Sequence, residues 1–215
     1  IIFSINSPGG KVSASKNFYD IITDYKKNND TEILFHTNEL LASGGYWAST
    51  SADGIYASYG SIIGSIGVKG PDWFYYDEPT SISTGIFGNN IETKKGIKVF
   101  SNKAGKSKDI LNPFRKPEMY ELEHLQEMVN DIYDEFVRVV SKERKIEIKN
   151  IKNNIGALIY TTKKAKQLHL IDDQLSLDNL ISKIIKENNY QNYKIIKRHI
   201  PKTNFLEQIL QNNNH

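Results

Sequence analysis

The sequence predicts an α/β fold in which a mainly parallel sheet is flanked by helices. Two observations support this prediction. First, residues 1–5 and 33–35 are apolar runs typical of buried strands, and an amphipathic stretch lies between them. A strand, a helix and a second strand in this order form a parallel pair. Second, strand-like runs at 54–57 and 62–68 are followed later in the chain by its longest helical pattern, over 117–145.

In chain order, the strand at 1–5 leads into an Asn-Ser-Pro-Gly-Gly turn at 6–10. The next segment places Phe18, Ile21, Ile22 and Tyr25 on one face of a helix. After the strand at 33–35, small residues that suit a helix run from 42 to 52. This arrangement predicts that Ser43 lies where a strand passes into a helix.

The segment from 70 to 90 has no clean period, and we interpret it as a loop or lid that carries an aromatic patch. Its aromatic residues could equally pack a long insertion onto the core; they are Trp73, Phe74, Tyr75 and Tyr76. A further strand is expected at 96–100. Two shorter helices are predicted over 162–168 and 177–186.

The length suits one domain, which we place at residues 1–187, with a polar extension over 188–215. Residues 1–5 indicate a strand that is already under way, so we expect further strands upstream of this chain. No apolar run reaches the roughly 20 residues of a membrane-spanning helix.

The composition limits the classes of function. The chain carries 28 Lys and Arg against 25 Asp and Glu, and the formal charge of +3 gives no reason to expect a nucleic-acid partner. Cysteine is absent, which excludes disulfides and thiolate catalysis.

The stretch Leu-Ala-Ser-Gly-Gly-Tyr-Trp at 41–47 is the best candidate for chemistry. Two glycines directly after Ser43 allow a sharp turn and bring amide N–H groups close to whatever the hydroxyl attacks. The alternative is an ordinary Ser-Gly-Gly turn.

A serine nucleophile needs a base that takes its proton. The five histidines have no context that favours this role; they are His36, His124, His169, His199 and His215. Lysine is the other option. On physical grounds Lys103, Lys106 and Lys108 serve equally well, so the residues alone leave a shortlist.

Five motifs then occur in order along the chain. They are Ser-Pro-Gly-Gly at 7–10, Ala-Ser-Gly-Gly-Tyr at 42–46, Ala-Asp-Gly-Ile-Tyr-Ala at 52–57, Gly-Ser-Ile-Gly-Val at 64–68 and Gly-Lys-Ser-Lys-Asp at 105–109. Together they resemble the signal peptide peptidase A (protease IV) family of serine peptidases. The resemblance implies the Clp protease/crotonase-like fold, with repeated β-β-α units.

The resemblance also assigns roles position by position. It implies that Ser43 is the nucleophile, Lys108 the general base and Ser65 the residue that positions the lysine amine. The oxyanion hole would use the backbone N–H groups of Gly10 and Gly44. The Clp branch has a histidine some two dozen residues after its nucleophile, and none lies near Val68, so the resemblance favours the serine–lysine branch.

The resemblance further implies peptide substrates, such as remnant signal peptides or other hydrophobic membrane-associated peptides, and a homo-oligomer. It implies no cofactor and no metal. The expected location is the bacterial cell membrane, on its extracytoplasmic face, through a segment absent from this chain. Two alternatives are a phage prohead peptidase of the same superfamily and an inactive oligomeric scaffold; a crotonase-like acyl-CoA enzyme is more distant.

Overall fold

The computed structural model describes residues 1–76, 83–85, 88–90, 100 and 102–198. They belong to two compact units, Ile1–Leu177 and Asp178–His215. Each unit is treated by itself, and the expected boundary at residue 187 stays a prediction. Most of the strand expected at 96–100, and much of the segment from 77 to 90, lie outside the described residues.

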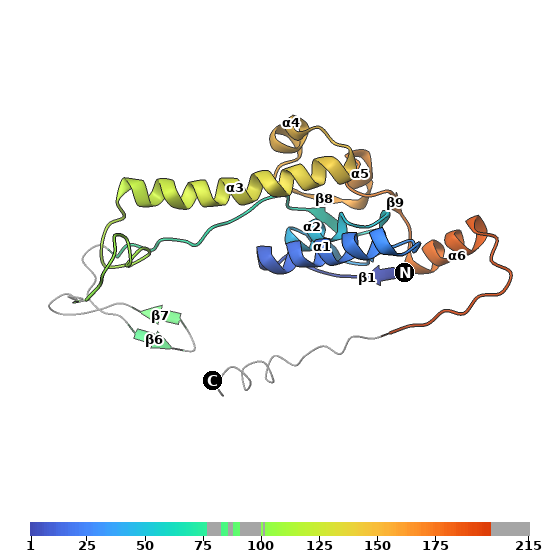
Figure 1. The fold of residues 1–215 in the computed structure, drawn as a ribbon, viewed down its shortest axis with the longest axis horizontal. Coiled ribbons are helices and arrows are strands. Elements are labelled where there is room, and N and C mark those ends of the chain that lie inside the picture. The colour runs from blue at the N-terminus through green and yellow to red at the C-terminus, as the bar shows by residue number, and fades with distance from the viewer. Residues whose placement is uncertain (77–82, 86–87, 91–99, 101, 199–215) are drawn as a thin grey trace. The chain divides into compact units, whose positions relative to one another are not determined.

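The first unit holds two main sheets (Figure 1). One sheet has the order β1-β2-β4-β9, with every pair parallel; its strands are β1 (Ile2–Ser4), β2 (Leu34–Thr37), β4 (Gly54–Ala57) and β9 (Asp173–Gln174). In the other sheet β3 (Leu40–Ala42) pairs parallel with β5 (Ile62–Gly64), and β8 (Ile159–Thr161) pairs antiparallel with β5. A small hairpin joins β6 (Ser83–Gly85) to β7 (Gly88–Asn90). The predicted α/β fold with a mainly parallel sheet is therefore confirmed.

The helices of the first unit are α1 (Val12–Asn28), α2 (Gly44–Ser49), α3 (Met119–Arg144), α4 (Ile148–Asn150), the π-helix η1 (Ile151–Ile155) and α5 (Thr162–Gln167). Helix α6 (Leu177–Glu187) begins at the last residue of this unit and otherwise belongs to the second. The helices expected at 117–145, 162–168 and 177–186 are thus confirmed to within a few residues. The hairpin strands β6 and β7, in the segment expected to be a loop or lid, and the strands β8 and β9 were not predicted; each has only two or three residues.

Two β-β-α units supply β2 and β4 of the four-stranded sheet and β3 and β5 of the three-stranded sheet. In the first, β2 joins the four-stranded sheet, β3 joins the other sheet, and α2 follows. In the second, β4 joins the four-stranded sheet, β5 joins the other sheet, and α3 is the next helix along the chain. The expected β-β-α repeat is thus present, and it places α2 and α3 as the helices that follow the two strand pairs.

The main core lies where α2 and α3 meet the strands. Trp47 of α2 stacks on Phe136 of α3, with ring centroids 4.6 Å apart and planes 8° apart. Both side chains are buried against Ile63 of β5 and its neighbours. The Tyr46 hydroxyl, also buried, donates to the backbone oxygen of Leu170 at 2.8 Å. These contacts fix α2, and with it the residue that precedes α2, against a rigid core.

Replacing Phe136 with Ala should lower the free energy of unfolding by about 3–5 kcal/mol, because a buried ring is lost and leaves a cavity beside Trp47. Denaturant unfolding measures this change. Leu122→Ala is the control, since Leu122 on the same helix is 40% exposed and should change the unfolding free energy by less than about 1 kcal/mol. A small effect of Phe136→Ala would contradict this account of the core.

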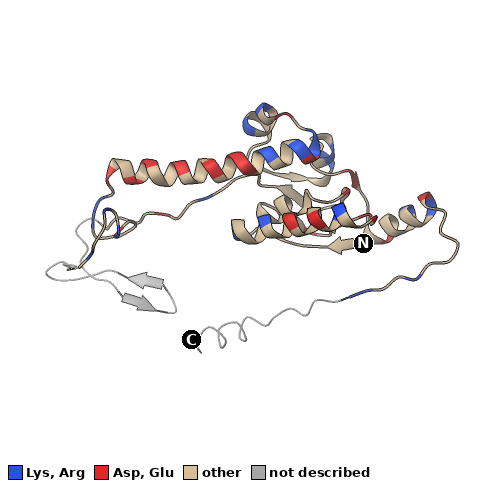
Figure 2. Cartoon of the chain, viewed as in Figure 1, with Lys and Arg blue, Asp and Glu red and all other residues tan. Residues whose placement is uncertain are grey.

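Charge is distributed unevenly along α3. Figure 2 shows acidic residues over most of the helix from its N-terminal end, and basic residues at its C-terminal end and on α4 and α5. Acidic groups near the start of a helix and basic groups near its end both interact favourably with the helix dipole. This charge order stabilises a helix whose first half has few buried residues. In the described part of the chain, no helix combines the length and apolar character that crossing a bilayer requires.

Candidate active site

Ser43 is the residue between β3 and α2, as predicted. Its backbone N–H donates to the oxygen of Gly64 at 2.9 Å, and its own oxygen accepts the N–H of Trp47 at 2.9 Å. Its φ angle is 51°, which is uncommon for a residue other than glycine. Strained backbone of this kind concentrates at functional sites, so the conformation adds independent weight to Ser43.

The glycine turn at 7–10 runs alongside β3 and reaches Ser43. The Ser7 N–H donates to Leu40 at 2.7 Å, and the Ala42 N–H donates to the Ser7 oxygen at 3.0 Å. Gly9 follows with a φ of +116°, and a Cβ atom there would lie 2.7 Å from the Ser43 Cβ and 3.0 Å from its Oγ. Only glycine fits so close to the hydroxyl.

The two amides expected to form the oxyanion hole are neighbours. A Cβ on Gly44 would lie 3.4 Å from the Gly10 nitrogen, and a Cβ on Gly9 would lie 3.2 Å from the Gly44 nitrogen. Gly44 is the first residue of α2, where N–H groups have no acceptor within the helix. The Ser15 Oγ of α1 would meet the same Gly44 Cβ at 2.2 Å, so α1 also packs against this turn.

A pocket of about 450 Å³ opens at Ser43 and contains Ser65 as well. Ser65 also has a positive φ, 55°, and its N–H donates to Leu158 at 2.7 Å. Residues 65–69 form one wall of the pocket and helix α3 another; the lining residues are Ser43, Ser65, Ile66, Gly67, Val68, Lys69, Gln126, Val129, Asn130, Tyr133 and Ala157. The pocket can therefore hold a partly apolar chain beside the Ser43 hydroxyl.

Lys108 lies elsewhere. It is exposed, in a segment of turns over residues 102–116 that precedes α3. Figure 1 shows this segment at the N-terminal end of α3, whereas α2 lies near the other end of the helix. Along α3, the rise from Tyr120 is about 9 Å to the first pocket residue, Gln126, and about 20 Å to the last, Tyr133. The structure thus brings Ser43, Ser65, Gly10 and Gly44 together but leaves Lys108 outside their pocket.

The other lysines of the shortlist are no closer. Lys103 pairs with Asp109, and the Lys106 amine lies 3.9 Å from the centre of the Tyr120 ring. Neither lines the Ser43 pocket.

The histidines of the described residues also stay outside the pocket. His36 is buried in β2, where its Nε2 lies 3.0 Å from the Leu175 oxygen, and burial lowers its pKa. A second, larger pocket of about 570 Å³ is lined mainly by amide and lysine side chains and by His169. Among the residues that the structure describes, no group of three or more His, Asp or Glu could hold a metal ion.

Sequence reasoning missed the close contact of Gly9 with Ser43. The sequence did contain a signal for this contact. The Ser-Pro-Gly-Gly turn has two consecutive glycines, although a single glycine would supply the N–H group of the oxyanion hole. Which glycine touches the nucleophile depends on a contact between residues distant in sequence, and a local pattern does not contain it.

The site combines a strained serine at the start of a helix, two neighbouring backbone amides and a pocket. These features are typical of α/β proteins that use a serine hydroxyl for hydrolysis. Comparison with known families goes further. The sequence matches peptidase family S49 over residues 26–191, which is most of the chain. The chain belongs to this family.

Individual relatives agree with the family. The chain is 32% identical over 197 residues to a protein of Methanocaldococcus jannaschii named as the protease MJ0651, covering 92% of this chain and 58% of the relative. It is 28% identical over 212 residues to a protein of Enterococcus faecium named as the signal peptide peptidase SppA, covering 99% and 58%. It is 27% identical over 185 residues to Protease 4 of Haemophilus influenzae, covering 85% and 27%. The chain therefore spans less than two thirds of these relatives.

Proposed function

We propose that the chain is the peptidase domain of a serine endopeptidase in which Ser43 attacks the peptide carbonyl and Lys108 is the general base. The observation that carries the proposal is the position of Ser43 beside Gly9, Gly10 and Gly44, at the mouth of a pocket. Membership of a peptidase family supports the same chemistry.

The proposed reaction has two halves. The Lys108 amine takes the proton of the Ser43 hydroxyl as Oγ bonds to the carbonyl carbon, and the Gly10 and Gly44 N–H groups stabilise the oxyanion. The lysine then gives the proton to the leaving amine, and the C–N bond breaks. In the second half, Lys108 takes a proton from water as the oxygen of this water bonds to the acyl carbon. The bond between that carbon and Ser43 Oγ then breaks, and Lys108 returns the proton to Oγ. Ser65 lines the pocket and would orient the lysine amine.

We infer that the Ser43 and Lys108 of one active site come from different copies of the chain. The segment that carries Lys108 is held at the first turn of α3, and the pocket lies further along the same helix. Lys108 does not line the pocket while those contacts hold, so in this structure the chain's own Lys108 does not reach its own Ser43. A head-to-tail contact between copies meets the requirement and agrees with the expected homo-oligomer.

The pocket favours peptides with an apolar residue next to the cleaved bond. Its lining includes Ile66, Val68, Val129 and Ala157 beside Ser43. Remnant signal peptides and other hydrophobic membrane-associated peptides fit this chemistry. The proposed location is the extracytoplasmic face of a cell membrane, with attachment through sequence outside this chain.

The test is covalent labelling with a fluorophosphonate, which reacts with activated serine hydroxyls. We expect the probe to bond to Ser43, identified by mass spectrometry of the digested protein. Labelling should be absent in Ser43→Ala and at least about 100-fold slower in Lys108→Ala, because the base is lost.

Ser182→Ala is the matched control, since the Ser182 hydroxyl lies on α6 and donates to the Asp178 backbone. It should label at the normal rate. Failure of the probe to label Ser43 in a protein that cleaves peptides would contradict Ser43 as the nucleophile.

A further inference from the structure

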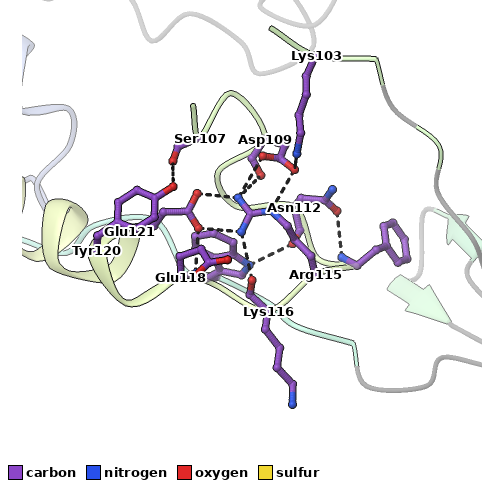
Figure 3. Close-up of polar contacts among 11 residues, drawn as sticks. Lys103, Ser107, Asp109, Asn112, Arg115, Lys116, Glu118, Tyr120 and Glu121 are labelled. Atoms are coloured by element: carbon purple, nitrogen blue, oxygen red, sulfur yellow. Dashed lines mark hydrogen bonds and ion pairs between the residues drawn. The ribbon is translucent and has the colours of Figure 1, made fainter. Parts of the chain in front are cut away.

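The turns that carry Lys108 are held by an ionic cluster centred on Arg115 (Figure 3). The guanidinium donates to Asp109, the residue after Lys108, through Nε at 3.0 Å and Nη2 at 3.1 Å. It also donates to Glu121 through Nη1 and Nη2, both at 2.7 Å. Lys103 forms a further ion pair with Asp109. One arginine thus joins two carboxylates by two hydrogen bonds each.

Glu121 makes this cluster part of α3. Its side chain is only 1% exposed, and it accepts the backbone N–H of Glu118 at 3.0 Å in a capping box at the start of the helix. Such a cap fixes the first helical turn. Through Arg115, Asp109 is therefore attached to the first turn of α3.

Both neighbours of Lys108 are anchored in this way. Before it, the Ser107 hydroxyl lies 2.6 Å from the Tyr120 hydroxyl of α3. After it, Asp109 is tied through Arg115 to Glu121. Lys108 itself is exposed, and among the described residues no hydrogen bond or ion pair of its amine is found. The backbone on each side is held while the amine stays available.

The aromatic segment before the hairpin also contacts the residues of this cluster and their neighbours. The Trp73 ring lies 5.1 Å from the Arg115 guanidinium carbon, and its Nε1 donates to the Asn112 oxygen at 3.1 Å. The Tyr76 N–H donates to the Pro113 oxygen at 2.9 Å. The aromatic residues thus pack onto the lysine segment, and the orientation of Arg115 is set by a flat ring as well as by two carboxylates.

We propose that Arg115 is a positioning residue that sets the place of the Lys108 amine in the reaction. This inference rests on the proposed function of Lys108. Arginine suits the role because its planar guanidinium pairs with two carboxylates at once, which the single ammonium of lysine cannot reproduce. Without Arg115 the residues around Lys108 are turns with a glycine at 105, and the amine would sample many positions.

The experiment compares Arg115→Ala, Arg115→Lys and the control Arg138→Ala. Arg138 lies on α3 and, in the described structure, pairs only with the half-buried Glu135. Peptide cleavage by the full protein gives kcat and KM separately. We expect kcat to fall about 100-fold in Arg115→Ala with KM nearly unchanged, because a misplaced base slows the chemical step but not binding. Arg115→Lys should restore little, and Arg138→Ala should match the original protein.

A second variant separates positioning from folding. Asp109→Asn removes only the carboxylate beside Lys108 and leaves the Arg115 pair with Glu121 in place. It should keep the melting temperature and still lower kcat. In a Lys108→Ala background, Arg115→Ala should add no further loss.

The outcomes distinguish the inference from the function on which it rests. If Lys108→Ala keeps full activity, the proposed base is wrong. If Lys108→Ala is inactive while both Arg115→Ala and Asp109→Asn keep the normal kcat, the base stands and the positioning role of Arg115 is overturned. A loss of kcat in Arg115→Ala that persists at equal size in the Lys108→Ala background would also overturn it.

Discussion

Chains with Ser43→Ala and chains with Lys108→Ala, each inactive alone, are expected to regain peptidase activity when they assemble together. Each variant alone should lose at least about 10⁴-fold in kcat, because a nucleophile and its base act as a unit. In a mixed assembly, some contacts bring an intact Ser43 of one copy to an intact Lys108 of the next. With random head-to-tail mixing about a quarter of the sites should work.

The measurement is peptide cleavage after co-expression of the two variants, with the double variant Ser43→Ala, Lys108→Ala mixed with the original chain as control. The double variant contributes neither group and should only dilute activity. If the two single variants stay inactive in an assembly shown to contain both, a pair shared between copies is wrong.

Gly9→Ala is expected to impair both activity and stability. The added Cβ would lie 2.7 Å from the Ser43 Cβ and 3.2 Å from the Gly44 nitrogen, and a φ of +116° is unfavourable for alanine. The strain should cost about 1–3 kcal/mol of unfolding free energy. Displacement of one oxyanion donor should lower kcat by about 100-fold to 1,000-fold.

Gly10→Ala is the matched control one residue away. A Cβ at Gly10 meets nothing within 4 Å, and alanine keeps the backbone N–H that the oxyanion hole needs. Its unfolding free energy should change by less than about 1 kcal/mol. Denaturant unfolding and steady-state kinetics on the pair measure both effects. Equal kinetics for the two variants would contradict the contact of Gly9 with the nucleophile.

The sequence was sufficient to predict the strands and helices that carry periodic apolar residues. The helix at Met119–Arg144 and the strand at Gly54–Ala57 were both found in this way. Short strands without an apolar run, such as the two-residue strand Asp173–Gln174, leave no period to detect. They form because a neighbouring strand supplies hydrogen-bond partners, and these partners lie far away in the sequence.

The candidate site was predicted in part, for a similar reason. Ser43 stands in a local motif between a strand and a glycine pair, so its role at a turn follows from its neighbours. The place of Lys108 does not, because it depends on how Arg115 joins Asp109 to Glu121 and on the length of α3. A resemblance transfers the role of a residue, whereas the distance between two residues is a property of the folded chain.

The length of α3 has a consequence for the life of the protein in a cell. Under the proposed pairing, a newly made single chain is a latent protease, because its own helix holds the base away from its own nucleophile. Cleavage then begins only when enough copies have accumulated to meet one another. The helix would protect the cell from stray proteolysis during synthesis without an inhibitor or a removable pro-segment, and dilution alone would return the enzyme to its latent form.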